Sequence, residues 1–271
     1  MILFEAMNAG KQIDGADILN NITIQIAEGE KVAIVGHNGS GKSSLLKLIG
    51  GIYENTSGQV KREKFITGYV PEHFPENIRF TIKEYLLLIG KMSGKTEGEI
   101  IKVIYDYSEL FSITAYLNTP LKNCSKGTKQ KAGIIQAMLT PPELFLLDEP
   151  LTGLDEPAQK QMLNILNSFN QRTSIVFTAH ESLLVDGLAE RVITIANGTI
   201  LSDEKKRINE KIYMIKAIVP NKEIVSTIDC VHMKYQEGNI IEWMVFAEQS
   251  DEVLIKLLNN GCKIIELKEK R

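Results

Sequence analysis

The chain has 271 residues, a length that allows one large domain or two smaller ones. It holds 31 Lys and Arg against 34 Asp and Glu, a formal net charge of -3, and this balance excludes a protein that grips long stretches of nucleic-acid backbone. With 44% hydrophobic and 24% charged residues, the composition is that of an ordinary folded domain, which excludes wholesale disorder.

Membrane and export signals are weak in this sequence. No apolar run approaches the roughly 18 residues that a membrane-spanning helix needs. Residues 1–5 have neither a basic nor a long apolar region, so we expect no signal peptide. Cys124, Cys230 and Cys262 lie too far apart for a disulfide framework or a zinc site, and we expect reduced thiols in a cytoplasmic protein. Any membrane role is expected to come through a partner.

The first predicted elements are strands followed by a helix. Residues 22–26 alternate between apolar and polar, as in a half-buried strand. Residues 32–35 are continuously apolar, which is typical of a central parallel strand that is buried on both faces. After a glycine-rich loop, the apolar residues of 45–49 predict a helix that Gly50 and Gly51 end.

The middle of the chain is predicted to be mostly helical. A strand pattern over 65–70 gives way to helical spacing from about residue 76 to residue 140, where two prolines follow. Capping boxes that begin at Thr81 and Thr96 predict helix starts within this segment.

Strands and helices then alternate. Residues 144–147 and 174–178 are predicted strands, and residues 162–169 have helical spacing between them. This alternation predicts a mostly parallel α/β sheet, interrupted by the helical segment before it.

The composition changes after this sheet. Residues 202–207 are polar and charged and are predicted to form a linker. Trp243 and Tyr235 stand among alternating apolar residues and are expected in a core rather than in a ligand site. A small α+β domain is predicted from two strand patterns and one helical pattern, at residues 212–219, 240–247 and 251–258.

The strongest motif lies between the predicted strand 32–35 and the helix after it. Residues 36–43, Gly-His-Asn-Gly-Ser-Gly-Lys-Ser, fit the phosphate-binding pattern G-x-x-x-x-G-K-[ST]. The glycines let backbone N–H groups turn toward a triphosphate, and the helix presents its positive end. We expect Lys42 to reach the β- and γ-phosphates and Ser43 to bind Mg²⁺. A chance glycine-rich turn is the alternative, and the strand–loop–helix context argues against it. The candidate nucleotide-binding residues here are Gly36, His37, Asn38, Gly39, Ser40, Gly41, Lys42, Ser43 and Ser44.

Two acidic residues end the predicted strand 144–147. We expect Asp148 to hold Mg²⁺, usually through water, and Glu149 to polarise the attacking water. Taken alone, the pair is equally well explained as two solvated carboxylates at a strand end. Because a phosphate-binding loop precedes it, we interpret the pair as metal-binding and catalytic.

With these motifs, the chain resembles the ATP-binding subunit of an ABC transporter. Residues 124–130, Cys-Ser-Lys-Gly-Thr-Lys-Gln, resemble the family signature LSGGQ and its basic continuation. Residues 152–155 resemble the D-loop, and His180 resembles the switch histidine that contacts the γ-phosphate. The resemblance covers roughly residues 1–201, and its motifs occur in the order that the family has.

The resemblance implies the fold of a P-loop NTPase. Its α/β core has a mostly parallel sheet, an antiparallel β subdomain and a helical subdomain, here at about residues 76–140. The ABC ATP-binding domain would span residues 1–203. A small C-terminal α+β accessory domain would span residues 204–271.

The resemblance also implies a mechanism in which two ATP molecules are sandwiched head to tail between two such chains. Ser125 and Gly127 would open a helix whose N-terminus caps the γ-phosphate of the partner's nucleotide, with Asp155 beside it. Glu149 and His180 would be the catalytic residues, and ATP with Mg²⁺ the ligands. A lone histidine at a strand end is more often structural, but the order and spacing favour the switch residue.

The expected partners are a transmembrane permease subunit and a second ATP-binding subunit, identical or different, and no nucleic acid. The chain would lie at the cytoplasmic face of the cell membrane, held there through the permease. The helical segment would pass the motion of the ATPase to the permease. Phe74 and Pro75 are expected either to line the docking groove or to form an exposed loop.

The chain departs from the family pattern at two places near the nucleotide. Glu72 stands where the Q-loop has glutamine, and we expect it to bind Mg²⁺. Because it adds negative charge near Asp148 and Glu149, we predict a shifted metal dependence. No aromatic residue stands at the A-loop position, near Gln12 and Ile13, so weaker stacking on adenine is expected and the preference for ATP over GTP is open.

The third departure is in the signature, which begins with Cys124 and has Lys126 in place of the first glycine. This variation and the short α+β tail resemble the subfamily that exports drugs and peptides. We therefore predict an exporter of drugs or antimicrobial peptides. For the tail we predict a regulatory or dimer-stabilising role.

Two other classes of ATPase are alternatives for this sequence. Mechanical ATPases of DNA repair share the signature helix but insert long coiled coils, whereas about eighty residues without sustained heptads separate the phosphate loop from the signature here. A non-transport or regulatory ABC-type ATPase that does not turn over is the other alternative. Glu149 and His180 argue against it, because a degenerate site often loses one of the two.

Overall fold

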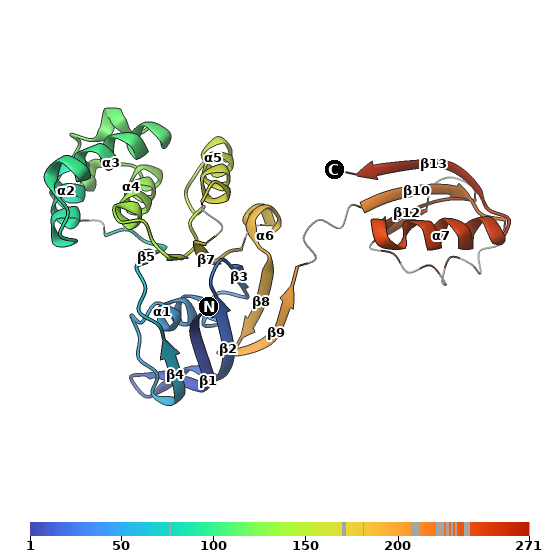
Figure 1. Cartoon of the computed structure of the whole chain (residues 1–271), viewed down its shortest axis with the longest axis horizontal. Coiled ribbons are helices and arrows are strands. Elements are labelled where there is room, and N and C mark those ends of the chain that lie inside the picture. The colour runs from blue at the N-terminus through green and yellow to red at the C-terminus, as the bar shows by residue number, and fades with distance from the viewer. Residues whose placement is uncertain are drawn as a thin grey trace. The chain divides into compact units, whose positions relative to one another are not determined.

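Figure 1 shows the computed structural model of the chain. The structure describes residues 1–75, 77–169, 172–180, 182–206, 212–220, 225, 228, 230, 232–235 and 239–270. The chain divides into two compact units, Met1–Lys206 and Arg207–Arg271. In the described part of the chain, no helix combines the length and the apolar character that crossing a membrane requires.

The first unit is built around a six-stranded sheet. Its strands are β3 (Lys31–Val35), β5 (Thr67–Val70), β6 (Leu144–Leu147), β7 (Ser174–Thr178), β8 (Arg191–Ala196) and β9 (Thr199–Lys205). They lie in the order β5-β6-β7-β3-β8-β9, and all neighbours are parallel except β8 and β9. The carboxyl ends of the parallel strands therefore meet at one edge of the sheet, which is where ligands bind in open α/β sheets.

A second, antiparallel sheet of the same unit contains β1 (Ile2–Ile13), β2 (Ala16–Ala27) and β4 (Ser57–Arg62), in the order β2-β1-β4. Together with α1 (Lys42–Ile49), it packs on one face of the six-stranded sheet. Leu146 of β6 and Val176 of β7 point into this core.

The other face of the six-stranded sheet is covered by helices. Phe145 of β6 and Phe177 of β7 point into this second core, because successive side chains of a strand face opposite sides. Besides α1, the described helices of the unit are α2 (Ile82–Met92), α3 (Glu97–Leu110), α4 (Lys126–Met138), α5 (Glu156–Asn167) and α6 (Ser182–Leu188), with short 3₁₀ turns η1 (Thr114–Tyr116) and η2 (Leu121–Asn123). The predicted capping boxes at Thr81 and Thr96 are both formed, and each begins a helix.

The second unit is a four-stranded antiparallel sheet with one helix. Its strands β10 (Ile212–Ile218), β11 (His232–Tyr235), β12 (Ile240–Phe246) and β13 (Lys263–Lys270) lie in the order β11-β12-β10-β13. Helix α7 (Ala247–Asn259) packs on the sheet through Val253 and Leu257. Trp243 is fully buried in this core, as predicted. The side chain of Tyr235 lies outside the described residues.

The predicted fold class is confirmed: a mostly parallel α/β core, an antiparallel sheet, a helical insertion and a small α+β unit. The predicted linker is wrong over residues 202–205, which belong to β9. These charged residues form an edge strand in which Arg191 of β8 binds Asp203 at 2.6 Å. Residue 76, the predicted start of the helical segment, and Arg207, the predicted end of the linker, lie outside the described residues.

Candidate active site

The phosphate-binding motif forms the loop between β3 and α1, at the carboxyl edge of the sheet (Figure 1). Two of its glycines are required by the backbone. A Cβ on Gly36 would lie 2.2 Å from the carbonyl oxygen of Ile195, and Gly41, which precedes α1, has φ +106°. A Cβ on Gly39 would meet no atom within 4 Å. The loop thus lies at the N-terminus of α1, and helix N-termini are sites that bind phosphate.

Ser40 supplies a second sign that a polar ligand belongs here. Its side chain is buried, and its Oγ has no hydrogen-bond partner among the described residues. Buried hydroxyl groups without partners are uncommon. Phosphate oxygens would accept a hydrogen bond from this hydroxyl group, so the loop fits a triphosphate.

Lys42 is buried, with only 5% of its side chain exposed. Its Nζ donates to the carbonyl oxygens of Gly36 at 3.0 Å and His37 at 3.2 Å. It also lies 3.2 Å from Nε2 of His180 and 3.9 Å from Oε1 of Glu149. Because a buried ammonium group is costly without partners, these contacts hold Lys42 at the mouth of the loop.

Asp148 follows β6 and is 3% exposed. Its Oδ1 accepts hydrogen bonds from Ser43 Oγ at 2.9 Å and from Thr178 Oγ1 at 2.8 Å. Burial and the neighbouring Asp148 carboxylate raise the pKa of Tyr69, which lies on the adjacent strand β5. The structure therefore brings together Ser43 and Asp148, two of the three residues that the sequence assigned to the metal.

Hard oxygen ligands such as a hydroxyl group and a carboxylate suit Mg²⁺, which usually keeps several waters and binds substrate phosphates. Ser43 and Asp148 fit that requirement beside the phosphate loop. Glu72, the third predicted ligand, pairs with His73 at 3.5 Å, and no hydrogen bond joins it to Ser43 or Asp148. It does lie near enough for its charge to act on Tyr69.

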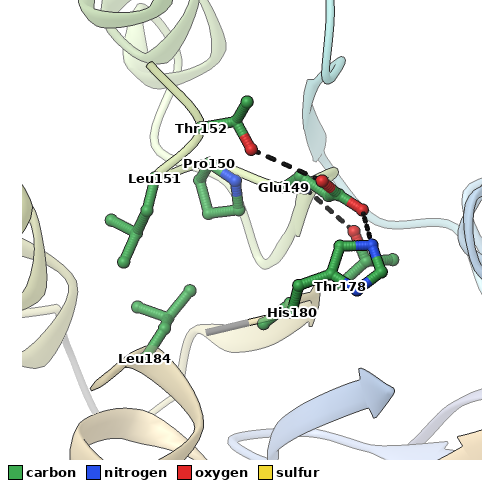
Figure 2. A pocket seen from close by; sticks show the side chains of 8 residues that line it. Glu149, Pro150, Leu151, Thr152, Thr178, His180 and Leu184 are labelled. Carbon is green, nitrogen blue, oxygen red and sulfur yellow. Dashed lines mark hydrogen bonds and ion pairs between the residues drawn. The ribbon is translucent and has the colours of Figure 1, made fainter. Parts of the chain in front are cut away.

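Glu149 and His180 are in direct contact. Oε1 of Glu149 lies 2.7 Å from Nε2 of His180, and Figure 2 shows the imidazole ring facing the carboxylate. Thr152 donates a 3.4 Å hydrogen bond to Oε2 of Glu149. The backbone of Glu149 has φ +47°, a left-handed conformation that is strained for a residue with a side chain and is typical of functional sites. These two predicted catalytic residues thus share one pocket.

The signature and D-loop residues lie apart from the phosphate loop of the same chain. Ser125 caps α4 by accepting the N–H of Thr128 at 3.1 Å, and Asp155 caps α5 by accepting the N–H of Ala158 at 3.0 Å. Gly127 packs against Gly153 of the D-loop. No hydrogen bond connects Ser125, Gly127 or Asp155 to the described loop residues 36–44.

Two further predictions concern the surroundings of the site. Phe74 is buried and packs edge-on against Tyr85 with ring centroids 5.5 Å apart, so it is not part of an exposed loop, whereas Pro75 is exposed. Gln12 is exposed and Ile13 is half-buried at the end of β1, the two residues near the predicted A-loop position.

Thr178 is a site residue that the sequence reasoning missed. It is fully buried at the end of β7, where its hydroxyl group links Asp148 to the N–H of Glu149 at 2.9 Å. The sequence did offer one signal. Thr178 is a polar residue at the end of the apolar strand 174–178, and the acidic residues Asp148 and Glu149 follow the apolar strand 144–147.

Comparisons with known proteins identify relatives of this chain by sequence and by fold. The sequence profile of the ABC transporter family matches residues 19–152. The ABC transporter ATP-binding protein NatA of Bacillus subtilis is 31% identical over 200 residues, covering 68% of this chain and 80% of NatA. The uncharacterized ABC transporter ATP-binding protein YhaQ of the same species is 29% identical over 261 residues. The aligned region covers 92% of this chain and 82% of YhaQ.

Relatives of a different stated role also match. The methionine import ATP-binding protein MetN of Clostridium acetobutylicum is 30% identical, covering 73% of this chain and 67% of MetN. Among solved structures, the dimeric post-hydrolysis ATP-binding cassette MJ0796, bound to ADP and Pi, superposes with a TM-score of 0.69. That likeness covers 76% of this chain and 99% of the cassette at 22% identity, and it supports the fold.

Proposed function

Because the chain belongs to the family of ABC transporter ATP-binding proteins, we propose that its phosphate loop, Asp148, Glu149 and His180 form the ATPase site that powers such a transporter. An ABC ATPase couples ATP hydrolysis to transport, and this chain is one. The observation that carries the residue assignment is the convergence of Lys42, Glu149 and His180 within hydrogen-bond or ion-pair distance.

In the proposed site, residues 36–44 bind the phosphates of ATP. Lys42 contacts the β- and γ-phosphates, and backbone N–H groups at the start of α1 point at them. The unpartnered hydroxyl group of Ser40 donates to a phosphate oxygen. Half-buried Ile13 packs against the adenine in place of an aromatic ring.

Ser43 and Asp148 are the residues that would hold Mg²⁺. When bound, the ion neutralises charge on the phosphates. Glu72 would act on this ion through its negative charge, which also contributes to the raised pKa of Tyr69. Thr178 fixes the Asp148 carboxylate by donating to Oδ1.

Glu149 orients the attacking water and accepts its proton. His180 contacts the γ-phosphate and, through its 2.7 Å contact with Oε1, sets the direction of the Glu149 carboxylate. The left-handed backbone at Glu149, anchored by Thr178, aims the same side chain into the pocket (Figure 2).

A complete site in this proposal needs a second chain. Ser125, Gly127 and Asp155 make no hydrogen bond to their own phosphate loop, which supports contact with the nucleotide of a partner. ATP binding would then close two subunits head to tail, and hydrolysis would reopen them. The similar cassette MJ0796 is described as dimeric, which supports the pairing of two subunits.

We further propose that the chain is bound to a permease at the cytoplasmic face of the membrane and drives export of drugs or peptides. The basis is the signature variation at Cys124 and Lys126 and the α+β tail. Because the relative MetN is named for import, the direction of transport is the decisive measurement. Inside-out vesicles with the permease should take up cargo on addition of ATP, and cargo movement out of such vesicles would overturn export.

The assignment of the catalytic residues is tested by Mg²⁺-dependent ATPase activity of the purified chain and of Glu149→Gln. The variant is expected to lose hydrolysis and still dimerise in ATP on gel filtration. Glu156→Gln, which removes an exposed carboxylate from α5, is the matched control and should keep full activity. A Glu149→Gln protein as active as the wild type would overturn the role of Glu149.

A further inference from the structure

A cavity of about 260 Å³ lies between the segment that follows β5 and the first turns of α4. Three residues of each element line this α4 cavity: Glu72, His73, Phe74, Lys126, Lys129 and Gln130. It shares no lining residue with the pocket of Glu149 and His180. The α4 cavity is therefore a second candidate binding site in the first unit.

Gln130 is a buried amide in this cavity that lacks a partner. Only 2% of the residue is exposed, and its Nε2 has no hydrogen-bond partner among the described residues. Buried polar groups are nearly always hydrogen-bonded, so an exception points to a missing partner. Because an amide nitrogen only donates, the partner that completes Gln130 must offer an acceptor oxygen.

Lys126 and Lys129 bring positive charge to the same cavity. Neither ammonium group has a hydrogen bond or an ion pair within the part of the chain that the structure describes, and Lys129 is half-buried. Burying a charge without a partner is costly. The aliphatic part of Lys126 lies against Gly153, where an added Cβ would come within 2.8 Å of the Lys126 Cδ atom. Both ammonium groups are thus available to a negatively charged ligand.

The start of α4 strengthens this positive field. A helix N-terminus carries partial positive charge and is stabilised by acidic residues in its first turn. Helix α4 has no acidic residue there, and it carries Lys126 at its first position and Lys129 three residues later. Cations at this end of a helix repel the helix dipole unless an anion lies between them. The same end of a helix binds phosphate and carboxylate groups readily.

Glu72 is the acidic residue among those that line the cavity. Its Oε1 lies 3.5 Å from Nδ1 of His73. Two ammonium groups outweigh this one carboxylate, so the lining has an excess of positive charge at neutral pH. A phosphate group carries enough acceptor oxygens to meet Gln130 and both lysines at once, whereas a carboxylate has only two. The chemistry of the lining therefore favours phosphate.

We propose that the α4 cavity binds a phosphate group, with Nε2 of Gln130 donating to one oxygen and the ammonium groups of Lys126 and Lys129 contacting the others. This site is additional to the phosphate loop and shares no residue with it. Free phosphate and a phosphate ester offer the same oxygens, and a titration with each separates the two sources.

The test is NMR spectroscopy of the full chain with the phosphate loop saturated by ADP and Mg²⁺. The side-chain amide signal of Gln130 is identified by its absence in Gln130→Met. This signal is expected to shift on titration with inorganic phosphate or with glycerol 3-phosphate, and the ligand that binds more tightly identifies the source. Sodium chloride at the same ionic strength should leave the signal in place, because it only screens the charges.

Lys129→Gln is expected to weaken phosphate binding about fivefold, because it removes one of the two ammonium groups. Glu72→Gln removes the opposing charge and should tighten binding. Lys122→Gln, which removes an exposed lysine that does not line the cavity, is the matched control and should bind like the wild type.

A Gln130 signal that stays in place at about 10 mM of either ligand would overturn the proposal. Equal weakening by Lys129→Gln and Lys122→Gln would overturn it as well, since it would show only a general effect of net charge. The titration involves no hydrolysis, so its failure is distinct from a failure of the proposed function, which ATPase activity decides.

Discussion

Thr178 donates its hydroxyl hydrogen to Oδ1 of Asp148 at 2.8 Å, and both side chains are buried. The same hydroxyl oxygen accepts the N–H of Glu149, whose backbone is left-handed. One hydroxyl group therefore anchors two neighbouring acidic residues, Asp148 through its carboxylate and Glu149 through its backbone. Asp148 faces Ser43, and Glu149 faces His180.

We predict that Thr178→Val lowers kcat about tenfold, because leaving the buried N–H of Glu149 without an acceptor costs roughly 1–3 kcal/mol and relaxes its backbone. KM for ATP should change little, since the phosphate loop is untouched. Thr178→Ser keeps the hydroxyl group and should retain most of the activity. Steady-state ATPase kinetics of the two variants provide the test, and equal losses in both would show that only packing matters at this position.

Glu72 adds a negative charge near Tyr69 and Asp148. We predict that Glu72→Gln raises the Mg²⁺ concentration for half-maximal ATPase activity about fivefold, since one screened unit charge at this range contributes roughly 1 kcal/mol. The measurement is a Mg²⁺ titration at saturating ATP. Glu54→Gln, at a 75% exposed side chain, is the control. An unchanged titration for Glu72→Gln would remove Glu72 from the account of metal binding.

Ile13 is half-buried at the end of β1, and in our proposal it packs against the adenine. We predict that Ile13→Tyr lowers KM for ATP about fivefold, because a base stacked on an aromatic ring gains roughly 1 kcal/mol or more. Ile13→Leu is the matched control and should behave like the wild type. Fluorescent ATP binding measures the effect, and equal affinities for all three proteins would place adenine elsewhere.

Trp243 is fully buried in the second unit, and its Nε1 has no hydrogen-bond partner among the described residues. We predict that Trp243→Ala destabilises this unit by about 3–5 kcal/mol, as large-to-small core substitutions do. Trp243→Phe should cost clearly less, because it keeps an aromatic ring and removes a buried donor that lacks a partner. Urea unfolding followed by circular dichroism compares the two, and a larger loss for Trp243→Phe would contradict this account.

Local sequence patterns predicted the elements that carry the site. The glycines and Lys42 of the phosphate loop, the Thr81 and Thr96 capping boxes and the apolar run before Asp148 each act within a few residues. Such features are readable because neighbouring residues determine them. The roles of Glu149 and His180 came from the order of the motifs, and the structure places the two side chains together.

Contacts between distant residues were not predictable in the same way. Thr178 and Asp148 are separated by 30 positions, and only the pairing of β6 with β7 brings them together. Residues 202–205 were misassigned because charged residues on an edge strand resemble a linker in composition. Strand β13 escaped prediction for a similar reason, since its charges break the alternation that identifies a strand.

The contacts of Lys42 have a consequence for the order of events in the proposed cycle. Its ammonium group donates to two carbonyl oxygens and lies 3.9 Å from the Glu149 carboxylate. An arriving γ-phosphate does not meet a bare cation; it competes with Glu149 for the same positive charge. In the proposed cycle, arrival of the substrate would therefore release Glu149 from its cation when the attacking water needs a base.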